Sequence, residues 1–393
     1  MTFPIPTTYN HGARRIIDDS GPRPVVALDS ATIGIVGTAP GAEADVFPLD
    51  TPVAILGDDV MAAKLGTTGT LPEAIALIFA QVRCRVVVIR VEEGADADAT
   101  QTNIIGGVQA DGSRKGLAAL RHARAITGLW PRILLAPGFT QHQAVLSAMV
   151  PLADALRGWI FPDGPNTTTQ AAIAYRAMFS SRRVVGPFDP WLVIRATDGS
   201  EKVVPSSPVA AGLAVKRHFE KGFWWSASNQ VANGVLGTAR PIDFTMGDPS
   251  CEQNTLNEHQ VNTWVMDGGV RLWGDDTCSD DTMWRFFSVV AADDIIGDSL
   301  VESYKRLVDA GITKNFFDEW AEQTRAFLRD LQNQGALIGF RVWADGDLNS
   351  PTNLAMGKAF LHYDYRSPTP ARDVITVSRL ANDFFADMFK GGL

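Results

Sequence analysis

The sequence predicts an α/β protein whose main sheet is largely parallel. Short runs of β-branched or apolar residues, such as 85–91 and 133–136, alternate with helical segments of about 10–15 residues. Strands that alternate with such helices are typical of βαβ crossovers, which place parallel strands side by side. The 393 residues, of which 46% are hydrophobic and 20% charged, suffice for a large core divided over two or three domains.

The expected elements of this α/β part follow one another from residue 25 onward. Thr70 and Glu73 have the spacing of a capping box and predict the start of a helix. Ser207 and Pro208 predict the start of another, because proline is favoured in the first helical turn. The strands are expected at residues 25–28, 33–36, 85–91, 133–136, 159–161, 183–185 and 191–195, and the helices at 70–82, 113–126, 141–156, 168–179 and 207–216.

The signal weakens after residue 197, and a second block of helix and strand begins near Asp298. Its clearest element is a helix at 315–334, which gathers apolar side chains on one face and ends at Gly335. The strands of this block are expected at residues 337–343 and 360–365. The block is therefore expected to form an α+β domain.

Each end of the chain is expected to be an extended arm that carries one strand. Prolines bracket residues 12–18 near the N-terminus, and the stiff spacer 367–370 precedes a β-forming run at 372–378. Isolated strands leave backbone N–H and C=O groups unpaired unless another sheet receives them. For the N-terminal stretch, a frayed terminus is an equally good explanation.

We predict that these arms donate strands to neighbouring copies of the chain. When one surface donates a strand and a different surface accepts it, the contacts between copies close into rings or propagate as helices. A homo-oligomer is therefore expected. The residues expected to link subunits are Arg14, Arg15, Ile16 and Ile17 in the first arm and Val374, Ile375, Thr376 and Val377 in the second.

Composition argues against two classes of partner. The net charge of −9 offers no general basic surface for nucleic acid or for an acidic membrane. The longest apolar helix candidate, residues 71–82, is shorter than the roughly 20 residues that span a bilayer, so no stable membrane insertion is expected.

The sequence also bears on the compartment of the protein. No targeting segment is visible. The three cysteines form no C-x-x-C pair, which indicates reduced core thiols in a cytosolic product.

None of the short motifs that would bind a ligand is complete. Gly34 and Gly37 match half of a dinucleotide fingerprint, but the third glycine is missing, and a tight strand-to-loop turn is the preferred interpretation. Residues 345–350 resemble the start of a calcium loop, yet Ser350 replaces the required glycine, and an Asx turn is expected instead. The six histidines have no zinc-binding spacing. Neither a metal nor a cofactor is therefore expected.

Two features keep an enzyme open as an alternative. The acidic doublets 275–276, 280–281 and 293–294 could supply the carboxylate pair of a glycosidase, although solvated loop charges are the preferred interpretation. Five tryptophans between residues 224 and 284 could line a sugar groove or serve as packing anchors. Because no complete catalytic set is present, we expect no enzymatic activity. An α/β enzyme acting on nucleotides or sugars is the alternative.

Several segments resemble the landmarks of contractile phage tail sheath proteins. They are residues 11–17, 33–40, 47–52 and 69–72 near the N-terminus, 222–229, 256–257 and 271–274 in the middle, and 357–360 and 368–375 near the C-terminus. The single residues that serve as family landmarks are Gly34, Gly37, Trp225, Asn229, Trp273 and Gly274. The resemblance covers nearly the whole chain in order, and it is greatest to the compact sheaths of short-genome myophages and R-type pyocins.

One departure from the family pattern follows Gly274. The family usually has a basic residue before the next threonine, whereas this chain has Asp275 and Asp276 before Thr277. The basic partner of any salt bridge that the family makes there is therefore missing.

The resemblance implies a structural subunit that stacks as sixfold rings around an inner tube and is linked by exchanged terminal strands. Such subunits contract to drive the tube through a target cell envelope, and with no nucleotide site the energy would be stored at assembly. The implied partners are the inner tail tube protein and the baseplate and tail terminator proteins. The implied location is a virion tail or a tailocin particle, assembled in the host cytoplasm. A second alternative is the sheath of a non-phage contractile injection system.

The same resemblance divides the chain into four parts. Residues 1–24 would be the N-terminal arm, 25–258 an outer α/β domain, 259–366 an inner sheath domain, and 367–393 the C-terminal arm.

Overall fold

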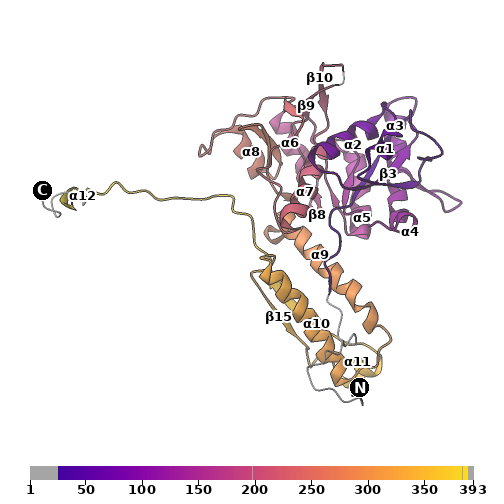
Figure 1. Ribbon diagram of the computed structural model, residues 1–393, viewed down its shortest axis with the longest axis vertical. Helices are drawn as coiled ribbons and strands as arrows, with labels where there is room; N and C mark the ends of the chain where they lie inside the picture. Colours follow the sequence, from indigo (N-terminus) through magenta and orange to yellow (C-terminus); the bar gives the residue numbers. More distant parts are fainter. Residues whose placement is uncertain (1–24, 197, 383, 388–393) are drawn as a thin grey trace, which may run out of the picture. The chain divides into compact units, whose positions relative to one another are not determined.

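The computed structural model describes residues 25–196, 198–382 and 384–387 (Figure 1). Its described residues form two compact units. The small unit contains residues 25–28 and 296–366, and the large unit contains residues 29–295 and those from 367 onward. Among the described residues, no helix combines the length and the apolar character needed to cross a membrane.

The large unit is built on a seven-stranded sheet in the order β14-β8-β7-β6-β1-β3-β2. β8, β7, β6, β1 and β3 run parallel, and the antiparallel strands β14 and β2 form the two edges. The strands are β1 Ile33–Thr38, β2 Pro52–Leu56, β3 Arg85–Val91, β6 Ile133–Leu135, β7 Trp159–Ile160, β8 Ser181–Val185 and β14 Thr277–Cys278. The predicted α/β class and its largely parallel sheet are confirmed.

Helices cover both faces of this sheet (Figure 1). On one face, α2 (Thr70–Gln81) packs against α7 (Ser207–Lys221). The two helices approach so closely that a Cβ at Gly212 would lie 2.9 Å from the side chain of Gln81. On the other face, α3 (Ala97–Ile105), the 3-10 helix η1 (Gly116–His122) and α5 (Gln143–Leu156) pack on an apolar cluster that includes Val36, Ile89 and Leu134.

Smaller elements complete the large unit. A three-stranded antiparallel sheet has the order β10-β9-β11, and β12 and β13 form an antiparallel pair. The remaining elements are α1 Asp59–Ala63, β4 Gly107–Val108, β5 Arg114–Lys115, α4 Ala123–Thr127, α6 Thr169–Arg176, β9 Leu192–Arg195, β10 Glu201–Val204, β11 Val235–Thr238, α8 Glu252–Glu258, β12 Thr263–Met266, β13 Val270–Trp273, η2 Thr282–Trp284 and α12 Phe384–Asp387.

Among its described residues, the small unit contains the second half of α9 (Phe287–Ser303), the helices α10 (Lys314–Asn333) and α11 (Pro351–Ala355), and a two-stranded sheet. The division between the units falls within α9, and α10 follows after η3 (Tyr304–Leu307). Thr313 caps α10 by accepting a hydrogen bond from the N–H of Phe316 at 3.2 Å, and Gly335 follows its end with a φ of +82°. The sheet pairs β15 (Gly339–Trp343) with β16 (His362–Arg366), and the short helix α11 lies between them in sequence.

Three local predictions are wrong. Residues 25–28 form no strand. Thr70 is the first helical residue rather than the cap, which is Gly69, because the Thr70 and Thr38 side chains accept hydrogen bonds from each other's N–H groups. Residues 113–126 form no continuous helix but a short strand, a 3-10 helix and the start of α4.

The structure also differs from the sequence analysis between residues 259 and 303. α9 was not expected before residue 298, although it begins at Phe287. β14 pairs with β8 and so belongs to the main sheet, which groups residues 259–295 with the large unit. The N-terminal arm and its residues Arg14, Arg15, Ile16 and Ile17 lie outside the described residues.

Candidate assembly interface

The C-terminal arm, residues 367–393, leaves the folded part of the chain without secondary structure up to residue 381. Its β-forming side chains are almost fully solvent-exposed: 80% for Val374, 77% for Ile375 and 90% for Val377. Thr376 is exposed as well. Four consecutive β-forming residues that bury nothing in their own chain are the kind of segment that another sheet receives.

The arm is attached to the large unit by one buried carboxylate. Asp276 is fully buried, and its Oδ1 accepts a hydrogen bond from Nε of Arg285 at 2.9 Å. Its Oδ2 accepts one from Arg372, which belongs to the arm. The Arg372 guanidinium also lies 4.9 Å from the centre of the Phe286 ring, a cation–π contact. Arg372 therefore fixes the arm to the body immediately before its β-forming run.

The backbone around Asp276 is held by Asn262. The Asn262 side chain accepts a hydrogen bond from the N–H of Asp276 at 3.0 Å and donates one to its carbonyl at 3.1 Å. The same amide donates to the carbonyl of Gly186 at 3.0 Å. Gly274 has a φ of +137°, and a Cβ there would lie 2.3 Å from Oδ1 of Asn262. The landmark Gly274 is thus required for the loop that presents Asp276.

Asp275 is buried next to this site. Its Oδ2 accepts hydrogen bonds from the hydroxyl of Ser288 at 2.7 Å and from the Ser288 N–H at 3.2 Å. Burial raises the pKa of Asp275 to about 6, and the hydrogen bonds from Ser288 and the positive charge of Arg372 limit the rise. The two neighbouring carboxyls therefore have separate partners.

The interpretation of the acidic doublets as solvated loop charges is wrong for Asp275, Asp276 and Asp294. Asp294 is nearly buried, makes an ion pair with Arg183 and accepts a hydrogen bond from Nε1 of Trp159 at 2.7 Å. Burial raises the pKa of Asp294, and Arg183 opposes the rise. Only the middle doublet is exposed, at residues 280–281. Sequence reasoning missed the pairs Asp276–Arg372 and Asp294–Arg183 because their members lie 96 and 111 residues apart along the chain.

The small unit offers a sheet with two open edges among the described residues. β15 and β16 pair only with each other, in a register that places Arg341 opposite Asp364 and Val342 opposite Tyr363. Arg341 and Asp364 form an exposed ion pair on one face. The other face contacts α10, and Arg325 of that helix donates a hydrogen bond to the carbonyl of Val342 at 3.2 Å.

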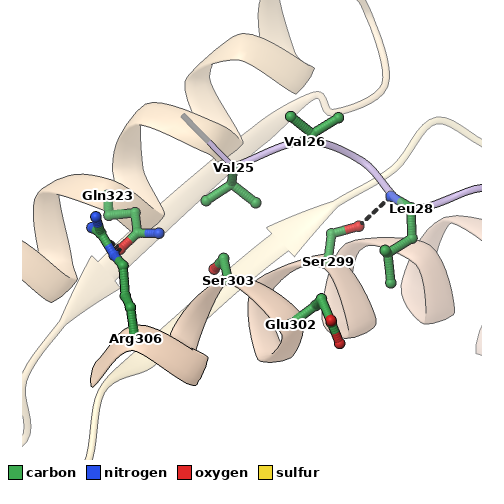
Figure 2. A pocket seen from close by; sticks show the side chains of 8 residues that line it. All are labelled: Val25, Val26, Leu28, Ser299, Glu302, Ser303, Arg306 and Gln323. Atoms are coloured by element: carbon green, nitrogen blue, oxygen red, sulfur yellow. Dashed lines mark hydrogen bonds between the residues drawn. The ribbon is translucent and has the colours of Figure 1, made fainter. Parts of the chain in front are cut away.

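A shallow groove of about 300 Å³ lies in the small unit beside residues 25–28 (Figure 2). The N–H of Leu28 donates a hydrogen bond to Oγ of Ser299 on α9 at 2.9 Å. Across the groove, Arg306 contacts Gln323 and, at 3.2 Å, Glu319 of α10. The segment before β1 is thus held on α9 by a side chain and not by strand pairing, which explains why the strand expected at residues 25–28 is absent.

The landmarks Gly34 and Gly37 lie inside β1 and not in the predicted strand-to-loop turn. A Cβ at Gly34 would lie 2.8 Å from Cβ of Pro131, and one at Gly37 would lie 2.5 Å from Oγ1 of Thr70. Both positions need glycine because a neighbouring element comes close to the strand.

The other landmarks make packing contacts. The ring of Trp225 lies 5.2 Å from the guanidinium of Arg217, and Trp273 contacts Phe244 with ring centres 5.1 Å apart. Asn229 adopts a φ of +64° and donates its N–H to the carbonyl of Leu272 at 2.6 Å. Of the remaining central tryptophans, Trp264 is fully buried, Trp224 contacts Phe223, and Trp284 lies against Arg182.

Two further titratable groups with shifted pKa values, Asp163 and His218, are buried inside the large unit. Burial raises the pKa of Asp163 to about 6, although its carboxylate accepts hydrogen bonds from Ser207, Gly138 and Thr140. Burial lowers the pKa of His218 to about 4. Since both side chains are enclosed by protein, these shifts reflect desolvation in a core.

No metal site is found in the part of the chain that the structure describes, where no three His, Cys, Asp or Glu side chains are grouped. Asp345 forms the expected Asx turn, because its Oδ1 accepts a hydrogen bond from the N–H of Asp347 at 2.8 Å.

The fold of the chain is similar to that of contractile sheath structures. The helical sheath of the anti-feeding prophage in its contracted state has a TM-score of 0.73 to this chain, with 20% identity over 94% of this chain and 99% of that one. The sheath of the extracellular contractile injection system PVC, also contracted, has a TM-score of 0.70 with 15% identity over 96% and 99%. At these identities the likeness concerns the fold.

Sequence comparison then identifies the family. The phage tail sheath protein central domain matches residues 112–278, and the phage tail sheath C-terminal domain matches residues 279–380. A prophage major tail sheath protein of Pseudomonas aeruginosa strain UCBPP-PA14 is 38% identical over 93% of this chain and 95% of its own length. The tail sheath protein of Escherichia phage P2 is 29% identical over 97% and 98%. The chain belongs to the phage tail sheath family, a family of structural proteins, as its landmarks predicted.

Proposed function

We propose that the chain is a tail sheath subunit that polymerises as stacked sixfold rings around an inner tube and contracts to drive the tube through a target cell envelope. The observation that carries this proposal is that one chain contains both an exposed β-forming arm and a two-stranded sheet whose edges are unpaired among the described residues. The arm at Val374, Ile375, Thr376 and Val377 has no strand partner among the described residues, and β15–β16 has two open edges.

The β15–β16 sheet is the receiving site in this proposal. A two-stranded sheet is marginally stable in water, and three or more strands are usually needed. Strands from neighbouring copies would complete it with backbone hydrogen bonds, one from a C-terminal arm and one from residues 14–17 of an N-terminal arm. Because donor and acceptor surfaces differ, each subunit would link to the next in an open series of rings or helices.

Contraction would use the arms as permanent links between bodies that move. The large unit would face outward and the small unit inward, toward the tube. The sequence holds no complete nucleotide-binding motif, so the energy would be stored at assembly. The extended and contracted states would then be two packings of the same subunit that differ at their interfaces. A larger buried contact in the contracted state would provide the driving force.

The proposed partners are other copies of the chain, the inner tail tube protein, and the baseplate and tail terminator proteins. The proposed location is a virion tail or a tailocin particle assembled in the host cytoplasm, and we propose no enzymatic activity. The structurally similar chains come from sheath and baseplate assemblies. The prophage and phage relatives, at 38% and 29% identity, favour a phage-type particle over a non-phage injection system.

The test compares Ile375→Pro with Ile375→Thr. Proline removes a backbone donor from the arm strand and clashes with a partner, whereas threonine keeps the donor and a high strand propensity. Since Ile375 is exposed, both variants should melt at the wild-type temperature. In sedimentation and negative-stain imaging, Ile375→Pro should form no sheath-like polymer, whereas Ile375→Thr should still polymerise. Normal assembly of Ile375→Pro would show that this strand links no subunits.

A further inference from the structure

At the base of the C-terminal arm, a buried carboxylate contacts two arginines from different parts of the chain. Asp276 is paired with two guanidiniums, one on each carboxylate oxygen. Arg285 lies nine residues away along the chain, after β14 and η2, whereas Arg372 lies 96 residues away in the arm. A buried carboxylate left without a partner is strongly destabilising. Here the departure of Arg372 would leave Asp276 paired with Arg285.

The two arginines are held to different degrees. The backbone of Arg285 is fixed, because its carbonyl accepts a hydrogen bond from the N–H of Thr277 at 2.7 Å and its guanidinium also reaches the carbonyl of Asn257 at 3.4 Å. Arg372 belongs to no helix or strand. Its guanidinium contacts the carboxylate of Asp276 and the ring of Phe286. Arg372 is therefore the less firmly held of the two partners.

We propose that Asp276 and Arg372 form a detachable latch that sets the free length of the C-terminal arm. With the latch closed, the free segment of the arm begins at Asp373. With the latch open, residues 367–372 join the free segment and add about 20 Å of extended chain. The two prolines at 368 and 370 stiffen the added piece, so it acts as a spacer.

The consequence for assembly rests on the proposed strand exchange. When two linked subunits move apart, the latch would open and the exchanged strand would stay paired. The subunits would then gain up to about 20 Å of separation. The latch itself is a property of a single subunit and is tested there. Failure of the Ile375→Pro test would therefore remove the strand exchange without deciding on the latch.

The experiment measures the distance between nitroxide labels at Thr282→Cys on the body and Thr369→Cys on the arm spacer. Both threonines are exposed, and the three native cysteines are buried, so labelling is confined to the new thiols. The labels lie on either side of the latch. Pulsed electron paramagnetic resonance on the unassembled subunit, isolated by gel filtration, then reports the width of the distance distribution.

We expect Arg372→Gln to widen this distribution at least twofold, and Asp276→Asn to widen it as well. Arg379→Gln is the matched control, since it removes the same charge from an exposed position farther along the arm. It should leave the width unchanged, as should Asp280→Asn on the exposed acidic doublet. Equal widths in Arg372→Gln and Arg379→Gln would overturn the latch. Loss of cooperative melting in Arg372→Gln would overturn it too, because the arm base would then be part of the core.

Discussion

The large and small units differ in how completely the faces of their sheets are buried. In the large unit, seven strands are covered on both faces, and side chains such as Ile33, Ile35 and Leu134 are fully buried. In the small unit, two strands are covered by α10 on one face, and Trp343 remains 42% exposed. A complete core makes the first unit self-sufficient. The second has two open strand edges among the described residues, and the proposed assembly would use them.

The largest effect that separates the two units is expected from a matched pair of tryptophan truncations. Trp159 is fully buried in β7 and donates a hydrogen bond to Asp294, so Trp159→Ala should lower the free energy of unfolding by about 3–5 kcal/mol. Trp343→Ala in β15 should cost less than about 1 kcal/mol in the unassembled subunit, because its site is half-open. Urea unfolding measures both. Similar costs would show that the small unit has a closed core of its own.

Amide hydrogen exchange should show the next largest difference. In the unassembled subunit, the amides of β15 and β16 should exchange fast, since a two-stranded sheet opens easily. In the polymer they should be slowed about 100-fold, whereas the amides of β3 should be equally slow in both states. The β3 amides serve as the internal control. Unchanged exchange of β15 and β16 on assembly would contradict a role of this sheet as the receiving site.

The third prediction concerns acid stability of the large-unit core. Burial lowers the pKa of His218 to about 4, so below its unfolded value of about 6.5 the unfolded chain binds a proton that the folded chain does not. Stability from this group is therefore lost as the pH falls from 7 toward 4, by about 2 kcal/mol at pH 5. His218→Phe keeps an aromatic ring beside Phe287 and Trp159 and should remove that loss.

The pH comparison must be made between wild type and variant, because buried carboxyls such as Asp163 and Asp275 act in the opposite direction. Burial raises the pKa values of Asp163 and Asp275 to about 6, so between about pH 4 and 6 the folded chain keeps protons that the unfolded chain has lost. Their contribution to stability increases as the pH falls. It is the same in both proteins and cancels in the difference. Parallel stability curves for wild type and His218→Phe would refute the role of His218.

The smallest effect is expected from the exposed ion pair of the small unit. Asp364→Ala should shift the melting temperature by less than about 1 °C, because fully solvated ion pairs contribute little. The corresponding change in the large unit, Asp294→Ala, removes the buried partner of Arg183 and leaves it only the exposed Asp154 at 3.4 Å, so it should lower the melting temperature by at least about 5 °C. Differential scanning calorimetry distinguishes them, and equal shifts would remove this contrast between the units.

The elements that could be predicted from the sequence are those with a pattern of their own. The strand Arg85–Val91 is a run of β-branched residues, and α10 carries a single apolar face bounded by Thr313 and Gly335, so both were placed almost to the residue. The part of α9 before residue 298 was missed because the side chains of α9 are buried on nearly all sides of the helix, polar ones such as Ser288, Asp294 and Asp298 included. Such a helix has no amphipathic stripe.

The candidate site was predicted in part. The exposed β-forming arm at Val374–Val377 was expected from its composition and the preceding prolines, and its role in linking subunits stays a prediction. Its attachment point could not be foreseen. The unusual pair Asp275–Asp276 was visible in the sequence as a departure from the family, but nothing in it indicated Arg372 as the partner.

The sequence by itself determined the α/β class, the family and the two-block order of the chain, because periodicity and family landmarks are local properties. Only the tertiary structure decided which charges are buried, which glycines lie inside β1, and where the C-terminal arm is held. Those features depend on residues far apart in the chain, such as Asp276 and Arg372, that meet once the sheet and its loops are in place. Burial then gives an aspartate or a glycine a role that its neighbours in sequence do not reveal.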